Sequence, residues 1–280
     1  MAKHYSLLEH LLFPPKYCSA KQLKKAIGQK NIVITGASYG IGEAIAYQLA
    51  SNNVHLILVA RTDSKLRRLK TKLEALGATI SIYSVDLSQE REVCLLIDHL
   101  KQQHNGIDIV ISNAGHSIKR SIHDSLERFH DFQRTMAINY FGPVQLLLAL
   151  IPLLKKNKGH IINISAVNVL LIPAPHWSAY QASKAAFDQW FRSVSLELKS
   201  DQISCSTVYL PLVKTRMIAP TPAYAKAPAM SPQHVAKIVG RLIYTKRRKF
   251  APWWLFFGQL GSLLFRNSWE FWLPLLLKKR

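Results

Sequence analysis

The sequence predicts an α/β fold in which one parallel sheet is covered by helices on both faces. Short runs rich in β-branched residues alternate with longer amphipathic stretches, which is the pattern of strands joined by helical crossovers. The strand candidates are apolar almost throughout, as expected for strands buried on both faces. A length of 280 residues and a hydrophobic content of 49% are sufficient for one large globular domain.

Six strands and the helices between them can be placed in order. We expect strands at residues 31–35, 55–59, 79–85, 107–112, 160–165 and 204–210. We expect helices at residues 42–50, 63–76, from a cap at Ser88 onward, 126–154, 180–198 and from Ser231-Pro232 to 244. This order predicts a doubly wound, Rossmann-like sheet. It forms a single domain at 31–249, between an N-terminal extension (1–30) and an apolar C-terminal extension (250–280).

Charge and cysteine content narrow the classes of function. The formal net charge of +21 favours an anionic partner, which could be nucleic acid, an anionic membrane or a phosphate-bearing substrate. Scattered solubilising lysines are the alternative. No helix-turn-helix signature is present, so we expect no nucleic-acid partner. The three cysteines are far apart, which predicts no metal site and no disulfide, and therefore a reducing, cytoplasmic setting.

The first residues resemble a short helix and not a cleaved signal peptide. The apolar run at 1–13 is interrupted by Glu9 and His10, and no small-residue cleavage site follows. We expect this helix to lie on the body of the protein or on a membrane.

A glycine-rich turn follows the first strand. The segment reads Thr35-Gly36-Ala37-Ser38-Tyr39-Gly40-Ile41-Gly42. Glycines at this point allow a tight turn and let the backbone approach a pyrophosphate, which then faces the positive end of the next helix. The cofactor-binding candidates here are Gly36, Ser38, Tyr39, Gly40, Ile41 and Gly42.

The end of the second strand indicates which dinucleotide is bound. An acid there would bind the ribose 2′-hydroxyl of NAD, whereas an arginine suits the 2′-phosphate of NADP. The sequence has Ala60-Arg61-Thr62 and no acid at this position. Arg61 can bind a phosphate through two parallel hydrogen bonds, so we expect NADP(H). The alternative is an ordinary surface arginine.

Three residues form a candidate catalytic group. Ser165 ends the fifth strand, and Tyr180 and Lys184 lie four residues apart on one face of the following helix. Reduction of a carbonyl needs a proton donor, but a free tyrosine has a pKa of about 10. We expect the neighbouring ammonium and a cationic nicotinamide to draw that pKa toward working pH. Ser165 would hydrogen-bond the substrate oxygen as charge develops.

The ordered motifs resemble the short-chain dehydrogenase/reductase family over residues 31–249. The resemblance implies that Asp86 contacts the adenine, that Asn113, Ala114 and Gly115 line the cofactor, and that Asn139 supports a proton-relay water as a fourth catalytic residue. It also implies contacts from Val213 and Thr215 to the nicotinamide amide. The family's usual Pro-Gly pair after the sixth strand corresponds to Leu210-Pro211 here, followed by Leu212, so the glycine is absent. By analogy with the family we expect a homo-oligomer.

Several segments are similar to bacterial fatty acyl-CoA reductases of the single-domain, Acr-like kind, namely residues 113–120, 128–132, 139–142 and 209–215. This likeness implies reduction of a long-chain acyl-CoA to a fatty aldehyde. His116, Lys119 and Arg120 are candidate contacts to the phosphates of CoA, or members of a solvated loop. The alternatives are a dehydrogenase of a lipid ketone, aldehyde or hydroxysteroid, and a nucleotide-sensing protein without turnover.

The C-terminal extension is apolar and aromatic. It contains Trp253, Trp254, Phe256 and Phe257, and basic clusters lie at 246–249 and 278–280. The first apolar run is shorter than the ~20 residues that a membrane-spanning helix needs. We expect peripheral contact with the inner face of an anionic membrane. The alternative is a segment that covers the substrate pocket or an oligomer interface.

Overall fold

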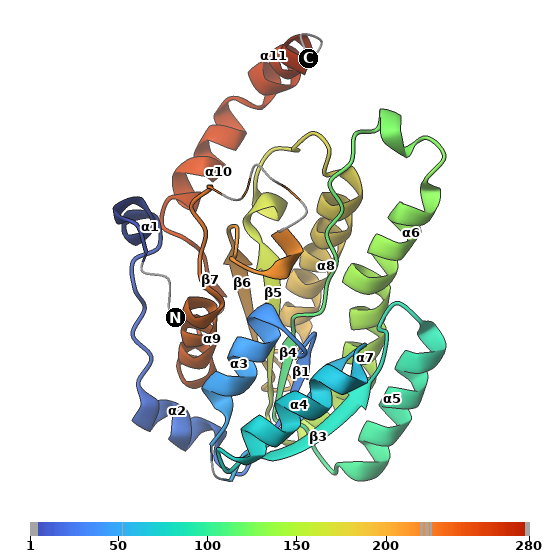
Figure 1. The fold of residues 1–280 in the computed structure, drawn as a ribbon, viewed down its shortest axis with the longest axis vertical. Helices are drawn as coiled ribbons and strands as arrows, with labels where there is room; N and C mark the ends of the chain where they lie inside the picture. The colour runs from blue at the N-terminus through green and yellow to red at the C-terminus, as the bar shows by residue number, and fades with distance from the viewer. Residues whose placement is uncertain (1–4, 52, 219–220, 222–223, 225, 278–280) are drawn as a thin grey trace.

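The computed structural model describes all residues except 1–4, 52, 219–220, 222–223, 225 and 278–280. Seven parallel strands form one sheet in the order β3-β2-β1-β4-β5-β6-β7 (Figure 1). The strands are β1(Asn31–Thr35), β2(His55–Ala60), β3(Thr79–Ser84), β4(Ile109–Ser112), β5(His160–Ala166), β6(Ser204–Leu210) and β7(Lys249–Phe250). The predicted doubly wound α/β fold is confirmed, and the short edge strand β7 is an addition.

Helices cover both faces of the sheet. One layer contains α2(Ala20–Ile27), α3(Gly40–Leu49), α4(Asp63–Glu74) and α9(Pro232–Thr245), and the other contains α5(Glu90–Gln103), α7(Gly142–Lys156) and α8(Ser178–Glu197). Side chains of a strand alternate between the two cores, so that Ile32 and Ile34 belong to one and Val33 to the other. All three side chains are fully buried, which explains why the strands are apolar throughout.

The long helix expected at 126–154 is interrupted. It begins as α6(Phe129–Met136), continues through a π-helical turn at Ala137–Phe141, and resumes as α7. Such turns insert one residue and are frequent at functional sites, and this one carries Asn139. Together these parts are the one helix among the described residues that is long and apolar enough to cross a membrane. Its buried leucines pack on the sheet, as in a core helix.

The helix after the third strand begins later than expected. Ser88 was expected to cap it, but the cap position is Gln89 and the helix starts at Glu90. The Ser88 hydroxyl instead donates a hydrogen bond to Asp86, at 2.7 Å. The other expected boundaries lie within a few residues of those observed.

The N-terminal extension lies on the body of the protein. Its first helix, α1(Leu7–Leu12), is closed by a capping box between Ser6 and Glu9. Glu9 also forms an ion pair with Lys214, at 2.5 Å, and accepts a hydrogen bond from the backbone of Ala229. The opposite side of α1 is open, and the side chain of Leu7 is 90% exposed.

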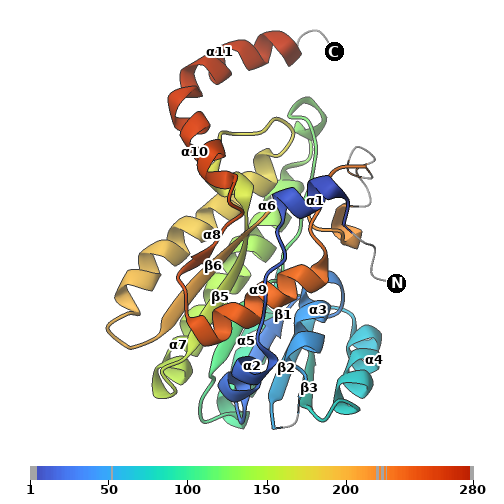
Figure 2. The same ribbon diagram turned by 90° about the vertical axis from the view of Figure 1, so that its left-hand side faces the viewer.

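The C-terminal extension leaves the body at the carboxyl edge of the sheet. It forms α10(Leu255–Leu264) and α11(Arg266–Leu277), which project beyond the other elements in both ribbon views (Figures 1 and 2). The base of this arm contacts the loop after β5, where the backbone N–H of Ile172 donates to Ser262 at 3.3 Å. Trp253 donates to the carbonyl of Leu11 at 3.0 Å, which joins the arm to α1.

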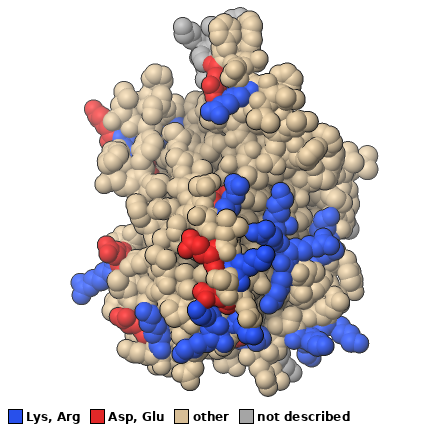
Figure 3. All heavy atoms as spheres, turned by 180° about the vertical axis from the view of Figure 1, so that it is seen from behind, with Lys and Arg blue, Asp and Glu red and all other residues tan. Residues whose placement is uncertain are grey.

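The first basic cluster lies at the edge of the sheet and not on the arm. Residues 246–249 lead into β7 beside the amino half of β6, where the carbonyls of Arg247 and Arg248 accept from Ser206 and Thr207. The second cluster, 278–280, lies outside the described residues. Lysines and arginines instead gather on the body, on the face opposite to that of Figure 1 and below the arm (Figure 3).

Candidate active site

A large cavity lies beyond the carboxyl ends of the parallel strands. The order of the strands reverses between β1 and β4, and ligands of open α/β sheets bind at such a switch point. The cavity has a volume of about 1250 Å³, which exceeds that of a site for one small ligand. Nearly all the predicted site residues line it: Gly36, Ser38, Tyr39, Gly40, Ile41, Arg61, Asp86, Asn113, Ala114, Gly115, Ser165, Tyr180, Lys184, Val213 and Thr215.

The glycine-rich turn is built so that only glycine fits. Gly36 and Gly40 have left-handed φ angles of +66° and +64°, a region that other residues rarely adopt. A Cβ on Gly42 would lie 2.2 Å from the carbonyl oxygen of Gly36. The turn therefore brings the backbone close to the start of α3, whose free N–H groups form an anion site. These features fit the pyrophosphate of a dinucleotide.

Arg61 and Asp86 face each other at the ends of neighbouring strands. The Arg61 guanidinium lies 3.7 Å from the Asp86 carboxylate, and its side chain is 66% exposed. Because that pair is long and open, Arg61 keeps donors free for a phosphate. The arrangement fits the 2′-phosphate of NADP.

The segment after β4 is fixed by the end of β1. The Thr35 hydroxyl accepts from the backbone N–H groups of Asn113 and Ala114, at 2.9 and 3.0 Å. The Asn113 amide donates to the Thr35 carbonyl at 2.9 Å. The wall of the cofactor end is thus hydrogen-bonded before any ligand binds.

Tyr180 and Lys184 line the other end of the cavity, and the buried side chain of Asn139 lies beside Gly115 next to them. The Lys184 ammonium donates to the carbonyl of Ile164 at 3.2 Å. The Asn139 amide donates to the His116 carbonyl and accepts from the His116 N–H, both at 2.9 Å. A Cβ on Gly115 would lie 3.0 Å from Asn139 Oδ1 and 3.3 Å from Lys184 Nζ, so these groups share one small space.

Burial controls the proton affinities of the pair. Burial, and next the neighbouring Tyr224 phenol, raises the pKa of Tyr180 to about 12. Burial lowers the pKa of Lys184 to about 8, and the Asp188 carboxylate opposes that shift. The expected lowering of this pKa requires a cationic nicotinamide beside the phenol as well as the ammonium, and it stays a prediction. With a pKa of about 12, the phenol is a protonated donor at neutral pH.

Ser165 lies at the cavity but is turned into the protein. Its side chain is 5% exposed, and its hydroxyl donates to the Asp188 carboxylate at 3.4 Å. Asp188 is itself buried and accepts a second hydrogen bond from Tyr209. No hydrogen bond joins Ser165 to Tyr180 in the part of the chain that the structure describes. The role of Ser165 toward a substrate therefore stays a prediction.

Two contributors were missed from the sequence. The Ser183 hydroxyl accepts from the Asn139 amide at 2.9 Å and so helps to fix its orientation. Trp177 lines the cavity, with its ring 5.7 Å from that of Tyr180 and 6.3 Å from that of Tyr224. Its position three residues before Tyr180, on the same helix face, was the available signal.

The comparisons with known proteins show the family to which the chain belongs. The short chain dehydrogenase family matches residues 30–225, and the chain belongs to that family of oxidoreductases. It is 41% identical to a fatty acyl-CoA reductase of Acinetobacter baylyi over 84% of this chain and 79% of that protein. A protein of Mycobacterium tuberculosis that is also named fatty acyl-CoA reductase is 38% identical, over 80% of this chain and 76% of its own length.

A solved structure gives the same fold. A metagenomic short-chain oxidoreductase in complex with NADP superposes with a TM-score of 0.68 and 28% identity, covering 78% of this chain and 92% of that one.

Proposed function

We propose that the protein is an NADP(H)-dependent reductase of lipid-like carbonyl compounds, and that it reduces a long-chain fatty acyl-CoA to the fatty aldehyde. The observation that carries this proposal is one cavity with a phosphate-binding turn and Arg61 at one end and the Tyr180–Lys184 pair at the other. The similarity to two proteins named fatty acyl-CoA reductase supports the thioester substrate.

The residues present fit the cofactor at three points. The glycine-rich turn would hold the pyrophosphate, Arg61 the 2′-phosphate, and Val213 and Thr215 the amide of the nicotinamide. The complex of the related oxidoreductase with NADP supports this assignment. NADPH, when bound, supplies the hydride that the carbonyl carbon receives.

Tyr180 supplies the proton. Its protonated phenol hydrogen-bonds the carbonyl oxygen and stabilises the oxyanion that forms as the carbon accepts the hydride. With a ketone, the phenol gives its proton to that oxygen and an alcohol results. With a thioester, the oxyanion collapses, the carbon–sulfur bond breaks, and the departing thiolate takes the proton, which leaves an aldehyde and free CoA.

Lys184 and Asn139 restore the proton. The Lys184 ammonium lies between the backbone of β5 and Asn139. It stabilises the phenolate that Tyr180 becomes, and the Asn139 amide supports a water that brings a proton from solvent. With a pKa of about 8, Lys184 is largely protonated at neutral pH.

The test uses purified protein, NADPH and palmitoyl-CoA, with absorbance at 340 nm and a thiol reagent read together. We expect one free thiol and one hexadecanal for each NADPH oxidised. Oxidation of NADPH with a lipid ketone or hydroxysteroid ketone, and none with the thioester, would replace the acyl-CoA assignment by the ketone reductase alternative. Binding of NADPH without turnover of any carbonyl would indicate a nucleotide sensor.

We also propose that the arm α10–α11 and the open side of α1 form a membrane-contact surface. Its exposed apolar side chains are Leu7, Leu8, Leu11, Phe256, Phe257, Leu260, Leu263, Leu264, Phe265, Phe271 and Trp272. Contiguous apolar surface of this extent is unusual on a free monomer. The arm lies at the carboxyl edge, where the cavity lies, so contact with the cytoplasmic face of a membrane would place a lipid-like substrate near the site.

A further inference from the structure

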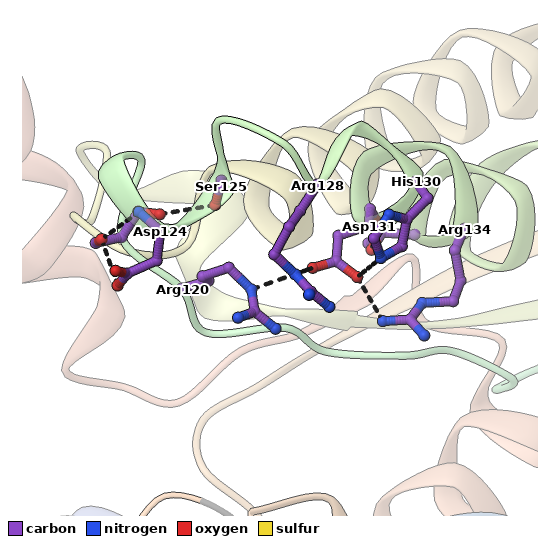
Figure 4. A network of polar contacts seen from close by, with 9 residues as sticks. Arg120, Asp124, Ser125, Arg128, His130, Asp131 and Arg134 are labelled. Carbon is purple, nitrogen blue, oxygen red and sulfur yellow. Dashed lines mark hydrogen bonds and ion pairs between the residues drawn. The ribbon is translucent and has the colours of Figure 1, made fainter.

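A cluster of arginines surrounds one buried carboxylate beside the cavity. Arg120 and Arg128 each donate through Nε to Asp131, both at 3.1 Å, and Arg134 donates through Nη2 at 2.6 Å. The Asp131 side chain is 2% exposed. Figure 4 shows the guanidinium groups converging on this carboxylate from the loop before α6 and from α6 itself. We call Arg120, Arg128 and Arg134 the arginine cluster.

The cluster holds more positive charge than its partner neutralises. Three guanidinium groups surround one carboxylate, and His130 is the other group near it, at 3.4 Å. Burial opposes ionisation of Asp131, but the Arg128 hydrogen bond and the charges of Arg128, Arg134 and His130 keep its pKa below the usual value. The carboxylate is thus ionised, and two positive charges remain. Their mutual repulsion would be relieved by a second anion.

The arginines are held so that their free ends face outward. Each uses one N–H group on Asp131, and each guanidinium has five. The side chains of Arg120, Arg128 and Arg134 are 34%, 40% and 52% exposed. A guanidinium group that Asp131 already holds in place loses little conformational entropy when it binds a phosphate through two hydrogen bonds.

The cluster reaches the catalytic cavity through Arg134, whereas Arg120 lines a separate small pocket with Asp131. Arg134, His130 and Lys119 line the cavity that contains Tyr180. The pKa of His116 is lowered by burial first, and then by the charges of Arg134 and Arg61. His116 thus experiences the charges of both Arg134 and Arg61, the residue assigned to the cofactor phosphate. The basic wall extends beyond what one dinucleotide phosphate at Arg61 requires.

We propose that the arginine cluster binds the phosphates of the substrate's nucleotide, the 3′-phospho-ADP of an acyl-CoA. This proposal rests on the proposed function. The long pantetheine arm would connect phosphates at the cluster with a thioester at Tyr180. Asp131 is a positioning residue, which orients the arginines and does not touch the ligand. A phosphate of NADPH has the same chemistry, so the experiment must separate the two sources.

The experiment compares two thioesters with one acyl chain. Palmitoyl-CoA carries the nucleotide phosphates, and S-palmitoyl-pantetheine carries none. The variants are Arg128→Gln and Arg134→Gln, with Arg134→Lys to retain the charge without the fork. Lys101→Gln, which removes an exposed charge at the far end of α5, is the matched control. Melting temperatures verify that each variant is folded.

We expect each glutamine variant to raise KM for palmitoyl-CoA about tenfold or more, since one hydrogen bond to a charged group is worth about 1.5–3 kcal/mol. The kcat values, KM for S-palmitoyl-pantetheine and KM for NADPH should change little. For Arg134→Lys, KM for palmitoyl-CoA should lie between the values of the wild type and of Arg134→Gln. For Lys101→Gln, it should equal the wild-type value. Free CoA, and not pantetheine, should inhibit the wild type.

Four outcomes would overturn the proposal. Equal losses with both thioesters would make the cluster a structural element of the cavity. A raised KM for NADPH with unchanged KM for palmitoyl-CoA would assign the cluster to the cofactor. If the wild type reduces neither thioester, the proposed function fails, and the CoA assignment fails with it; if it reduces both and the variants do not discriminate, only the CoA assignment fails.

Discussion

The residues of the site differ in how directly the sequence reveals them. The glycines of the turn, Tyr180 and Lys184 could be predicted because one short segment fixes each spacing. The sequence could not show that the Ser165 hydroxyl points to Asp188, because a contact 23 residues apart depends on how α8 lies on β5. It also could not show that burial raises the pKa of Tyr180, because burial cannot be read from the type of neighbouring residue.

Replacing Tyr180 by phenylalanine removes the proton donor and keeps the ring. General acids contribute about 10²–10⁴-fold to rates, so we expect kcat to fall by that factor. NADPH affinity, measured by fluorescence, should remain within about twofold of the wild-type value. A variant that keeps more than about a tenth of the activity would show that another group gives the proton.

Ser165→Ala tests the predicted oxyanion contact. We expect kcat to fall about 10²-fold, the lower end for loss of such a donor, because the hydroxyl must first turn away from Asp188. A lowered melting temperature with unchanged kcat would make Ser165 only a structural partner of Asp188. Asn168 would then be the next candidate, since it lines the cavity and its amide nitrogen can donate to an oxyanion.

Arg61→Gln tests the choice of cofactor. The guanidinium fork is exposed and its one acidic neighbour is distant, so it is available to a phosphate. We expect KM for NADPH to rise at least about tenfold, as one charge-assisted hydrogen bond is worth about 1.5–3 kcal/mol. KM for NADH should hardly change, since NADH lacks the phosphate. Parallel increases for both cofactors would contradict this role.

Helices and strands could be predicted from the sequence wherever the local hydrophobic pattern matches the way the element packs in the fold. The six predicted strands are all present because each is a short run rich in β-branched residues between helices. The helix at α6–α7 was predicted as continuous, since a π-helical turn leaves the hydrophobic period almost unchanged. The edge strand β7 is only two residues long and begins with a lysine, so no pattern marks it. The path of the arm is set by contacts at Ile172 and Leu11, far away in the sequence.

We expect the arm α10–α11 to bind lipid vesicles through its exposed aromatic rings. Phe256 and Phe271 are 67% and 66% exposed, and burial of one such ring contributes about 2 kcal/mol. Wild-type protein should float with vesicles of phosphatidylcholine and phosphatidylglycerol. The double variant Phe256→Glu, Phe271→Glu should remain in the soluble fraction, and Leu95→Glu on exposed α5 should float as the wild type does. Equal flotation of both variants, or none by the wild type, would favour the alternative of packing against protein.

A buried histidine at the amino edge of the sheet makes the stability of the whole protein depend on pH. His160 is 2% exposed and its Nε2 lies 2.7 Å from the Ser206 hydroxyl. Burial, and next the charge of Lys246, lowers its pKa to about 3. The folded state therefore keeps His160 neutral down to that pH, whereas the unfolded chain takes up a proton below its pKa of about 6.5. The contribution of His160 to the unfolding free energy is therefore fully present above pH 6.5 and is lost as the pH falls toward 3.

His160→Gln removes this loss and retains an N–H for Ser206. Between pH 7 and 5.5, the unfolding free energy of the wild type should fall by about 1 kcal/mol more than that of the variant, because one extra proton binds the unfolded chain. Urea unfolding at both pH values measures the difference. Equal falls would mean that His160 is protonated in the folded protein.

The proposed reaction depends most on one step, the transfer of a hydride from NADPH to the carbonyl carbon of a lipid-like substrate, with Tyr180 as the acid. Purified protein would be given palmitoyl-CoA and NADPH deuterated at C4 on both faces, and the aldehyde analysed by mass spectrometry. The account predicts one deuterium at the aldehyde carbon for the wild type and almost no labelled product for Tyr180→Phe in the same time. Unlabelled aldehyde, or undiminished labelling by the variant, would contradict it.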